Sequence, residues 1–152
     1  MQYDLNAMWC LNQESAAETS SLTLEAFELL TRKALHVGVV ANGTTGFLIA
    51  LGPDADYDNE NYHWLCRRYD QFVYIDRVVV ATVARRQGIA ARLYAELAIA
   101  ARTAGHRHLA CEVNIAPPNP SSEAFHVRQG FAPVGLAQLK NGKRVQYWLR
   151  DL

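Results

Sequence analysis

The stretch that decides the fold is Val78-Val79-Val80-Ala81-Thr82-Val83-Ala84-Arg85-Arg86-Gln87-Gly88-Ile89-Ala90, which leads from an apolar strand through a short basic turn into an alanine-rich helix. The first amides of a helix have no partners within the helix and carry a partial positive charge. A strand, turn and helix in this order are therefore suited to bind a phosphate. Gly88 allows the backbone to approach such a ligand, and Arg85 and Arg86 add positive charge. The alternative is an ordinary turn that needs a glycine for steric reasons.

Composition indicates one globular domain over residues 1–152, because half of the residues are hydrophobic. Fifteen Lys and Arg balance fifteen Asp and Glu, which disfavours nucleic acid or an anionic membrane as partner. Cys10, Cys66 and Cys111 are odd in number and widely spaced, which favours a reduced cytoplasmic protein over a disulfide scaffold or a metal site. No apolar run approaches the ~20 residues that span a bilayer.

The spacing of apolar residues and turn signals predicts an α/β fold with a mixed sheet. The nearly continuous apolar run 72–81 is typical of a central strand covered on both faces. A helix over 89–104 separates it from another buried-type strand, 108–114, so these two strands are expected to be parallel neighbours. The other expected strands are 5–12, 35–40, 46–51, 131–139 and 144–149, and the other expected helices are 24–34, 60–68 and 120–129.

A second motif lies in Asn119-Pro120-Ser121-Ser122-Glu123-Ala124-Phe125-His126-Val127-Arg128-Gln129-Gly130-Phe131. It follows the pattern N-x-x-A/S-x-x-L-Y-x-x-x-G-F, with Phe and His at the L and Y positions, and the earlier turn follows Q/R-x-x-G-x-G/A. Together the two motifs resemble the GNAT superfamily of N-acetyltransferases, with some likeness to the phosphinothricin acetyltransferase branch, which has histidine at the position of His126. The resemblance implies the acyl-CoA N-acyltransferase fold: a mostly antiparallel sheet flanked by helices, with one parallel strand pair that splays apart.

The resemblance also implies that the chain binds acetyl-CoA. The pyrophosphate would lie at the amides of residues 86–90, and the pantetheine arm between strands 72–81 and 108–114. Asn119 would contact this arm while it caps its own helix. The backbone N–H of Val80 would be a donor to the oxyanion that forms during acetyl transfer. The complete set of implied cofactor contacts is Val78, Val80, Arg85, Arg86, Gln87, Gly88, Ile89, Ala90, Asn119 and Ser122.

Three residues are candidates for the chemistry. By resemblance, His126 occupies the position of a tyrosine that protonates the departing thiolate, and an ordinary histidine would be roughly a quarter protonated at pH 7. The alternative role of His126 is a hydrogen bond to Ser122. Tyr74 lies where some family members carry a glutamate base, and Asp76 follows on what is expected to be the same face of the strand. The identity of the base stays open, because Asp76 can equally form a structural pair with Arg77.

The acceptor site has weaker signals. Glu112 and Asn114 alternate on strand 108–114 and are expected to line the pocket, or Glu112 neutralises Arg77. Tyr62 and Trp64 belong to an aromatic segment that either walls the acceptor site or packs in the core. The sequence thus favours an acetyl-CoA-dependent N-acetyltransferase that acts on the primary amine of a small or amino-acid-like acceptor. The alternatives are a protein or peptide N-acetyltransferase and a non-catalytic acyl-CoA-binding module; a homodimer through the final hairpin is plausible.

Overall fold

The computed structural model describes residues 3–17 and 19–152. The helices are α1 (Leu5–Glu14), α2 (Leu24–Lys33), α3 (Glu60–Cys66), α4 (Ile89–Thr103) and α5 (Pro120–Arg128), with short 3-10 turns η1 (Ala41–Gly43) and η2 (Thr82–Ala84). The strands are β1 (His36–Val40), β2 (Gly46–Leu51), β3 (Phe72–Val80), β4 (His108–Ala116), β5 (Ala132–Gln138) and β6 (Arg144–Asp151). They form one sheet in the order β1-β2-β3-β4-β6-β5, in which β3 and β4 are parallel and the other pairs antiparallel.

The predicted fold class is confirmed, but the strand predicted at residues 5–12 is wrong. These residues form most of α1, which begins because the side chain of Asp4 accepts a hydrogen bond from the Ala7 amide at 3.0 Å. Met8, Leu11 and Asn12 are the buried residues of α1, and their spacing of three and four matches one face of a helix. Asn12 interrupts the apolar pattern because it is a buried polar residue, which the sequence does not reveal.

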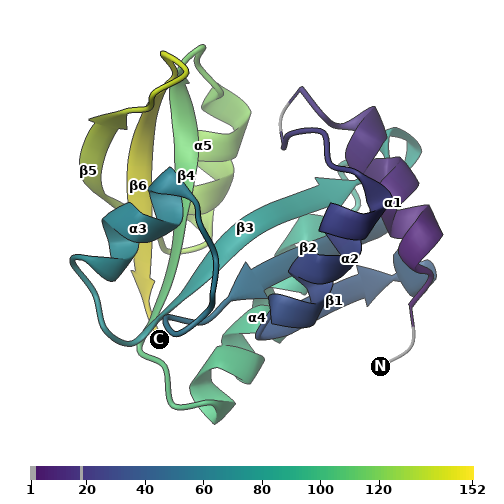
Figure 1. Ribbon diagram of the computed structural model, residues 1–152, viewed down its shortest axis with the longest axis horizontal. Helices are drawn as coiled ribbons and strands as arrows, with labels where there is room; N and C mark the ends of the chain where they lie inside the picture. The colour runs from purple at the N-terminus through teal and green to yellow at the C-terminus, as the bar shows by residue number, and fades with distance from the viewer. Residues whose placement is uncertain (1–2, 18) are drawn as a thin grey trace.

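β3 and β4 stay together only at their first residues. They pair at Phe72–His108, Val73–Leu109 and Tyr74–Ala110, and then diverge (Figure 1). On the other side of β3, the register with β2 shifts between Ile75 and Arg77, so Asp76 is an extra residue, a β-bulge. A bulge bends its strand and increases its twist. The splayed parallel pair implied by the resemblance is therefore present, with a bulge beside the point of divergence.

The bulge also reverses the alternation of side chains along β3. Residues 74, 76, 78 and 80 were predicted to share one face, and this is wrong beyond Asp76. Tyr74 packs in the core cluster that includes residues of α1, α2 and α3, whereas Val78 packs against the cluster built on α4. Val79 returns to the side of Tyr74. The extra residue shifts the phase of the strand by one, so the pleat alone cannot predict which side chains meet.

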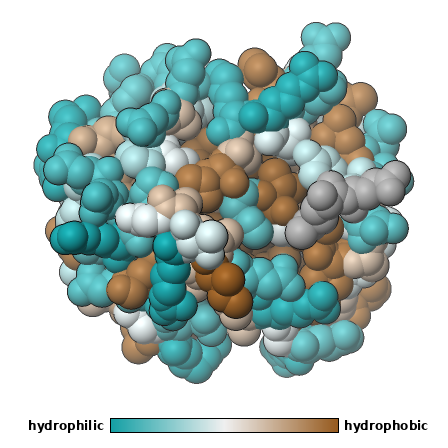
Figure 2. All heavy atoms as spheres, turned by 90° about the horizontal axis from the view of Figure 1, so that it is seen from below, coloured by the Kyte–Doolittle hydropathy of each residue, from teal (hydrophilic) through white to brown (hydrophobic). Residues whose placement is uncertain are grey.

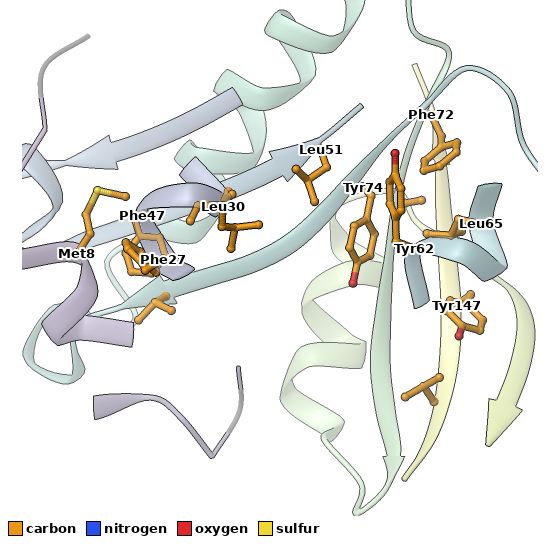
Figure 3. Packing of buried hydrophobic residues seen from close by; sticks show 14 of the residues in the cluster. Met8, Phe27, Leu30, Phe47, Leu51, Tyr62, Leu65, Phe72, Tyr74 and Tyr147 are labelled. Atoms are coloured by element: carbon orange, nitrogen blue, oxygen red, sulfur yellow. The ribbon is translucent and has the colours of Figure 1, made fainter. Parts of the chain in front are cut away.

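Helices cover both faces of the sheet. α4 lies behind it, α1 and α2 lie in front of β2 and β3, and α3 lies in front of β4 and β6 (Figure 1). The front core has one part around Phe27 and Phe47, whose rings meet edge to face at 5.6 Å. Its other part contains Tyr62 and Leu65 of α3, which pack with Tyr147 of β6 (Figure 3). The first part packs against β2, and the second packs against β4 and β6, so each half of the splayed sheet has its own part of the core.

The surface mixes hydrophilic and hydrophobic side chains. On the face seen from below, hydrophobic residues form patches between hydrophilic ones (Figure 2). The large exposed apolar side chains come from separate elements, such as Val83 in η2, Ile99 in α4 and Leu136 in β5. Scattered residues of this kind are normal for a protein surface. Within residues 3–17 and 19–152, none of the helices combines the length and apolar character required to cross a membrane.

Candidate active site

A cleft of about 430 Å³ opens where β3 and β4 separate. Both strands line it, together with the starts of α4 and α5 and the segment that joins α1 to α2. Of the site residues predicted from the sequence, it brings together Asp76, Val78, Val80, Arg85, Ala90, Glu112, Asn114, Asn119, Ser122 and His126. The remaining residues of the predicted cofactor turn, 86–89, complete the loop between Arg85 and Ala90. Tyr62, Trp64 and Tyr74 do not line this cleft.

The turn before α4 has the backbone of an anion-binding loop. Arg86 and Gly88 have positive φ angles of 64° and 75°. Gly88 occupies the N-cap position of α4 without a side-chain cap, so the first amides of the helix have no side-chain partner. A Cβ atom added at Gly88 would meet nothing within 4 Å, so open space lies beside these amides. Together with the exposed Arg85 side chain, this geometry fits a phosphate group.

Asn119 begins α5 as predicted. Its Oδ1 accepts a hydrogen bond from the Ser122 amide at 3.3 Å, and Pro120 occupies the first turn of the helix. Asn119 and Ser122 both line the cleft. The start of α5 is therefore fixed by local capping, which places both polar side chains at the cleft.

His126 is buried, and both of its ring nitrogens have partners. Nδ1 lies 2.7 Å from the Ser122 carbonyl oxygen, which can only accept, so Nδ1 carries the hydrogen. Nε2 of the neutral ring therefore accepts from the Tyr94 hydroxyl at 2.8 Å. Burial lowers the pKa of His126, although the Ser122 carbonyl opposes this shift. The fraction of imidazolium at pH 7 is thus below the quarter expected from the sequence, and the predicted contact with Ser122 is present.

Tyr94 is a cleft residue that the sequence did not single out. It lies in the apolar stripe of α4, where an aromatic residue carries no signal other than that of a core position. Burial raises the pKa of the Tyr94 hydroxyl, and the nearby Cys111 and Glu112 raise it further. Tyr94 therefore stays protonated and supplies the hydrogen that it shares with His126.

Glu112 lines the cleft, and one of its carboxyl oxygens is without a hydrogen-bond partner in the described part of the chain. Its Oε1 accepts hydrogen bonds from the Tyr74 hydroxyl at 2.9 Å and from the Asn61 side chain at 3.1 Å. Its Oε2 is buried and has no hydrogen-bond partner within residues 3–17 and 19–152. Burial raises the pKa of Glu112 to about 8, with a further increase from Asp76 and an opposing effect of the Tyr74 hydrogen bond. A buried oxygen without a partner is costly unless a ligand completes it.

The Tyr74 hydroxyl acts on Glu112 and does not reach the cleft. Tyr74 is buried, and its pKa is raised by burial and by Glu112. A second support comes from Asn61 of α3, whose Oδ1 accepts from the Tyr147 hydroxyl at 2.8 Å, so that its amide nitrogen points at Glu112. Tyr74 and Asn61 thus orient one oxygen of Glu112 and leave the other free. Asn61 could not be predicted from the sequence, because its contacts join segments far apart in the chain.

Asp76 has both oxygens occupied. Oδ2 accepts from Arg77 Nε at 2.9 Å, and Oδ1 accepts from the Tyr57 hydroxyl at 2.6 Å. The alternative role predicted for Asp76, a structural pair with Arg77, is present. The proposal that Glu112 neutralises Arg77 is wrong, because the adjacent Asp76 takes that position. Asp76 is thus less available than Glu112 to accept a proton.

Tyr62 and Trp64 are core residues, as their alternative interpretation predicted. The Tyr62 hydroxyl donates to the Gly52 carbonyl and accepts from the Ala55 amide, and its ring packs 5.8 Å from that of Tyr74 (Figure 3). Trp64 stacks on Tyr147 with ring centroids 4.0 Å apart. Tyr62 is buried in the core, whereas Trp64 is partly buried and packs against the edge of that core. Neither is available to wall the acceptor end of the cleft.

The Trp64 ring also predicts a stability effect at Gly135 of β5. A Cβ atom added at Gly135 would lie 2.5 Å from Cζ2 and 2.6 Å from Cη2 of Trp64. We therefore expect Gly135→Ala to lower the free energy of unfolding by about 1–3 kcal/mol through overpacking, measured by urea denaturation. The same change in a Trp64→Ala background lacks the obstructing ring and is the control. Equal losses in both backgrounds would contradict this explanation.

The chain is similar to acetyltransferases in both sequence and structure. The sequence matches the profile of the Acetyltransferase (GNAT) family over residues 13–131. A ribosomal-protein-alanine N-acetyltransferase from Brucella melitensis has a similar structure, with a TM-score of 0.72 and 21% identity over 98% of this chain and 94% of that one. A protein assigned as a phosphinothricin N-acetyltransferase has a TM-score of 0.69 and 18% identity, over 98% of this chain and 92% of that one.

A further structural relative holds the coenzyme. It is assigned as a streptothricin acetyltransferase from Bacillus anthracis str. Ames, and its structure is a complex with acetyl coenzyme A. Its TM-score is 0.57 and its identity 19%, over 76% of this chain and 60% of that one. At such identities a structural likeness shows the fold alone. Among curated proteins, none matches the chain in sequence.

Proposed function

Because the chain belongs to the GNAT family and is an acetyl-CoA-dependent N-acetyltransferase, we propose that its acceptor is the primary amine of a small or amino-acid-like molecule, which attacks the acetyl group directly. The observation that carries this proposal is Glu112, which lines the cleft between β3 and β4 and whose buried Oε2 has no hydrogen-bond partner among the residues that the structure describes. An amine that enters this cleft comes close to a carboxyl oxygen that none of the described residues satisfies, and this oxygen accepts a hydrogen bond once Glu112 is ionised. Ser15 and Thr19 line the same cleft from a different segment, which favours a small, partly enclosed acceptor over a long peptide.

The residues around the cleft fit acetyl-CoA, which supplies an acetyl group activated as a thioester. In the proposed assignment, the amides at the start of α4, with Arg85 beside them, bind the pyrophosphate. The exposed backbone of β3 at Val78 and Val80 pairs with the pantetheine arm, since β4 has separated from this part of the strand. Asn119 and Ser122, which also line the cleft, contact the arm.

Glu112 is proposed as the base. An alkyl amine has a pKa near that of lysine, about 10.4, so an ordinary glutamate at about 4.3 would accept its proton at a cost of about 8 kcal/mol. With the pKa of Glu112 raised to about 8, the mismatch is about 2.4 units, and the transfer costs about 3 kcal/mol. The same burial that raises this pKa keeps water away from Oε2. Asp76, for which the sequence left a catalytic and a structural role open, is proposed to act structurally through its pair with Arg77.

The Tyr94–His126 pair is proposed to protonate the departing sulfur. In the neutral pair, the shared hydrogen belongs to Tyr94, because Nε2 of His126 accepts it. When Nε2 of His126 takes up a proton from solvent, it donates to the Tyr94 oxygen and the hydroxyl hydrogen becomes free to move to the thiolate sulfur. Tyr94 then keeps the proton from His126, so the pair returns to its neutral form.

A double-mutant cycle tests this pair. Tyr94→Phe and His126→Phe are each expected to lower kcat by about tenfold or more, because each removes one half of the same proton path. The double variant should lose little beyond either single change, since the two residues act as a unit. The Kd of CoA, measured by isothermal titration calorimetry, should stay within about twofold. Additive losses in kcat, or an unchanged kcat in both single variants, would contradict the assignment.

The proposed function is tested with the full chain, acetyl-CoA and a panel of small amines and short peptides. Release of free thiol together with an acetylated small amine, identified by mass spectrometry, is the expected result. Acetylation of peptides but not of small amines would establish the alternative of a peptide N-acetyltransferase. Binding of CoA without thiol release on any acceptor would favour a non-catalytic binding module. The last outcome would overturn the proposal.

A further inference from the structure

We propose that Arg77 is a positioning residue that fixes the acceptor-side wall of the cleft, which rests on the proposed function of that cleft. Arg77 follows the bulge in β3, and its side chain is only 5% exposed. The direction of this side chain is set by the bulge, because the extra residue turns position 77 toward α1. A buried guanidinium is costly, so all of its contacts need to be accounted for.

The contacts of Arg77 are to the end of α1 and the segment that follows it. Nη1 donates to the Asn12 Oδ1 at 2.8 Å and to the Ser20 carbonyl at 3.4 Å, and Nη2 donates to the Ser20 Oγ at 3.3 Å. Nε donates to Asp76. One planar group thus donates to four acceptor atoms on Asn12, Ser20 and Asp76, which a lysine cannot reproduce because its ammonium is a point charge.

Asn12 extends this contact through the segment. It is fully buried, and its Nδ2 donates to the Ser20 carbonyl and to the Gln13 side chain, each at 3.1 Å. The Thr19 hydroxyl lies 3.3 Å from Asn12 Oδ1 and 3.0 Å from the Ser15 carbonyl, to which it can donate. Gln13, Thr19 and Ser20 therefore all contact Asn12, which is the residue that Arg77 binds.

The same segment forms one wall of the cleft. Ser15 and Thr19 line the cleft together with Asp76 and Glu112. The Asp76 carboxylate is bound by the same guanidinium. Arg77 therefore sets the position of both the segment wall and the acidic side chain next to it, without being the group that accepts the proton of the amine. An acceptor held against this wall would be placed relative to Oε2 of Glu112.

Two variants test this assignment. Arg77→Lys keeps the charge and removes the planar fork. Ser20→Gly removes one contact of Arg77, and Ser20 has a φ of 124°, a conformation that favours glycine, so this variant is expected to fold. We expect the KM of the acceptor to rise about tenfold in Arg77→Lys and about threefold in Ser20→Gly, because small displacements of a bound substrate are costly. The Kd of CoA should stay within about twofold in both. Arg32→Lys, at an exposed ion pair in α2, is the matched control.

A second readout does not depend on catalysis. Amide hydrogen exchange of residues 13–22 should be faster in Arg77→Lys and in Ser20→Gly, while that of α4 stays unchanged. Unchanged exchange and an unchanged acceptor KM in Ser20→Gly would overturn the assignment, even if Arg77→Lys fails to fold. Equal increases in the KM of the acceptor and the Kd of CoA would show a general structural role instead and would also overturn it. Absence of acetyl transfer by the wild type would contradict the proposed function, and hydrogen exchange would then decide the role of Arg77 alone.

Discussion

Glu112→Gln is expected to lower kcat/KM for the amine acceptor by about 10²–10³-fold, because the amide cannot accept a proton from the amine. Glutamine has the same shape, and its carbonyl oxygen can still accept from Tyr74 and Asn61, so the site should keep its geometry. The Kd of CoA is expected to stay within about twofold of the wild type. Steady-state kinetics of thiol release and calorimetric titration of CoA measure the two quantities.

The matched control is Glu28→Gln, which changes an exposed glutamate of α2 in the same way. It should leave kcat/KM unchanged, since an exposed ion pair contributes little. A Glu112→Gln variant with more than half of the wild-type activity would exclude Glu112 as the base. Asp76→Asn would then be the next variant to measure, although both oxygens of Asp76 already have partners.

The pH dependence should identify the same group. Burial raises the pKa of Glu112 to about 8, so the carboxyl is neutral and inactive as a base at lower pH. We expect kcat/KM to rise about tenfold per unit of pH and to level off near the pKa of this group.

The effect of pH on the stability of the protein has the opposite sign to its effect on activity. Because the folded state holds the proton more tightly than the unfolded chain, this carboxyl makes the protein less stable as pH rises from about 4.5 to about 8. The Glu112→Gln variant should lack this part of the decline.

The features that the sequence predicts well are local ones. The turn at Gly88 and the cap at Asn119 depend on residues within four positions of each other, so residue type and spacing are sufficient to find them. The parallel pairing of β3 and β4 joins more distant residues, but it follows from the order strand, helix, strand, because strands joined by a crossover helix are usually parallel neighbours. These signals identify the turn before α4 and the start of α5, which both line the cleft and are proposed to bind the cofactor.

The acceptor side could not be predicted in the same way, because its geometry depends on the register of β3. The bulge at Asp76 changes which side chains share a face, and no residue type in that stretch announces it. The sequence does not distinguish Tyr94 from the core residues of α4, because its role depends on the hydroxyl, which lies 2.8 Å from Nε2 of His126. Asn61 meets Glu112 across 51 positions of sequence. Contacts of this range are set by tertiary packing, which overrides local pattern.

The cofactor side gives the second large effect. Gly88→Asp is expected to raise the Kd of CoA by about 10²-fold, since like charges about 4 Å apart near a protein surface repel by up to about 4 kcal/mol before screening by salt. The new side chain has room, because a Cβ atom at Gly88 meets nothing within 4 Å. Aspartate also tolerates a positive φ better than most residues and is a favourable N-cap, so the fold should be retained.

Gly142→Asp is the matched control for this change. Gly142 also has a positive φ, 86°, and open space around its missing Cβ, but it lies in the turn between β5 and β6. It does not line the cleft, so the same substitution there adds the same charge without placing it beside the start of α4. The Kd of CoA, measured by calorimetry in low salt, should be unchanged in Gly142→Asp and should approach the wild-type value in Gly88→Asp as salt screens the repulsion. If Gly88→Asp bound CoA as tightly as Gly142→Asp at every salt concentration, the diphosphate would have to bind elsewhere.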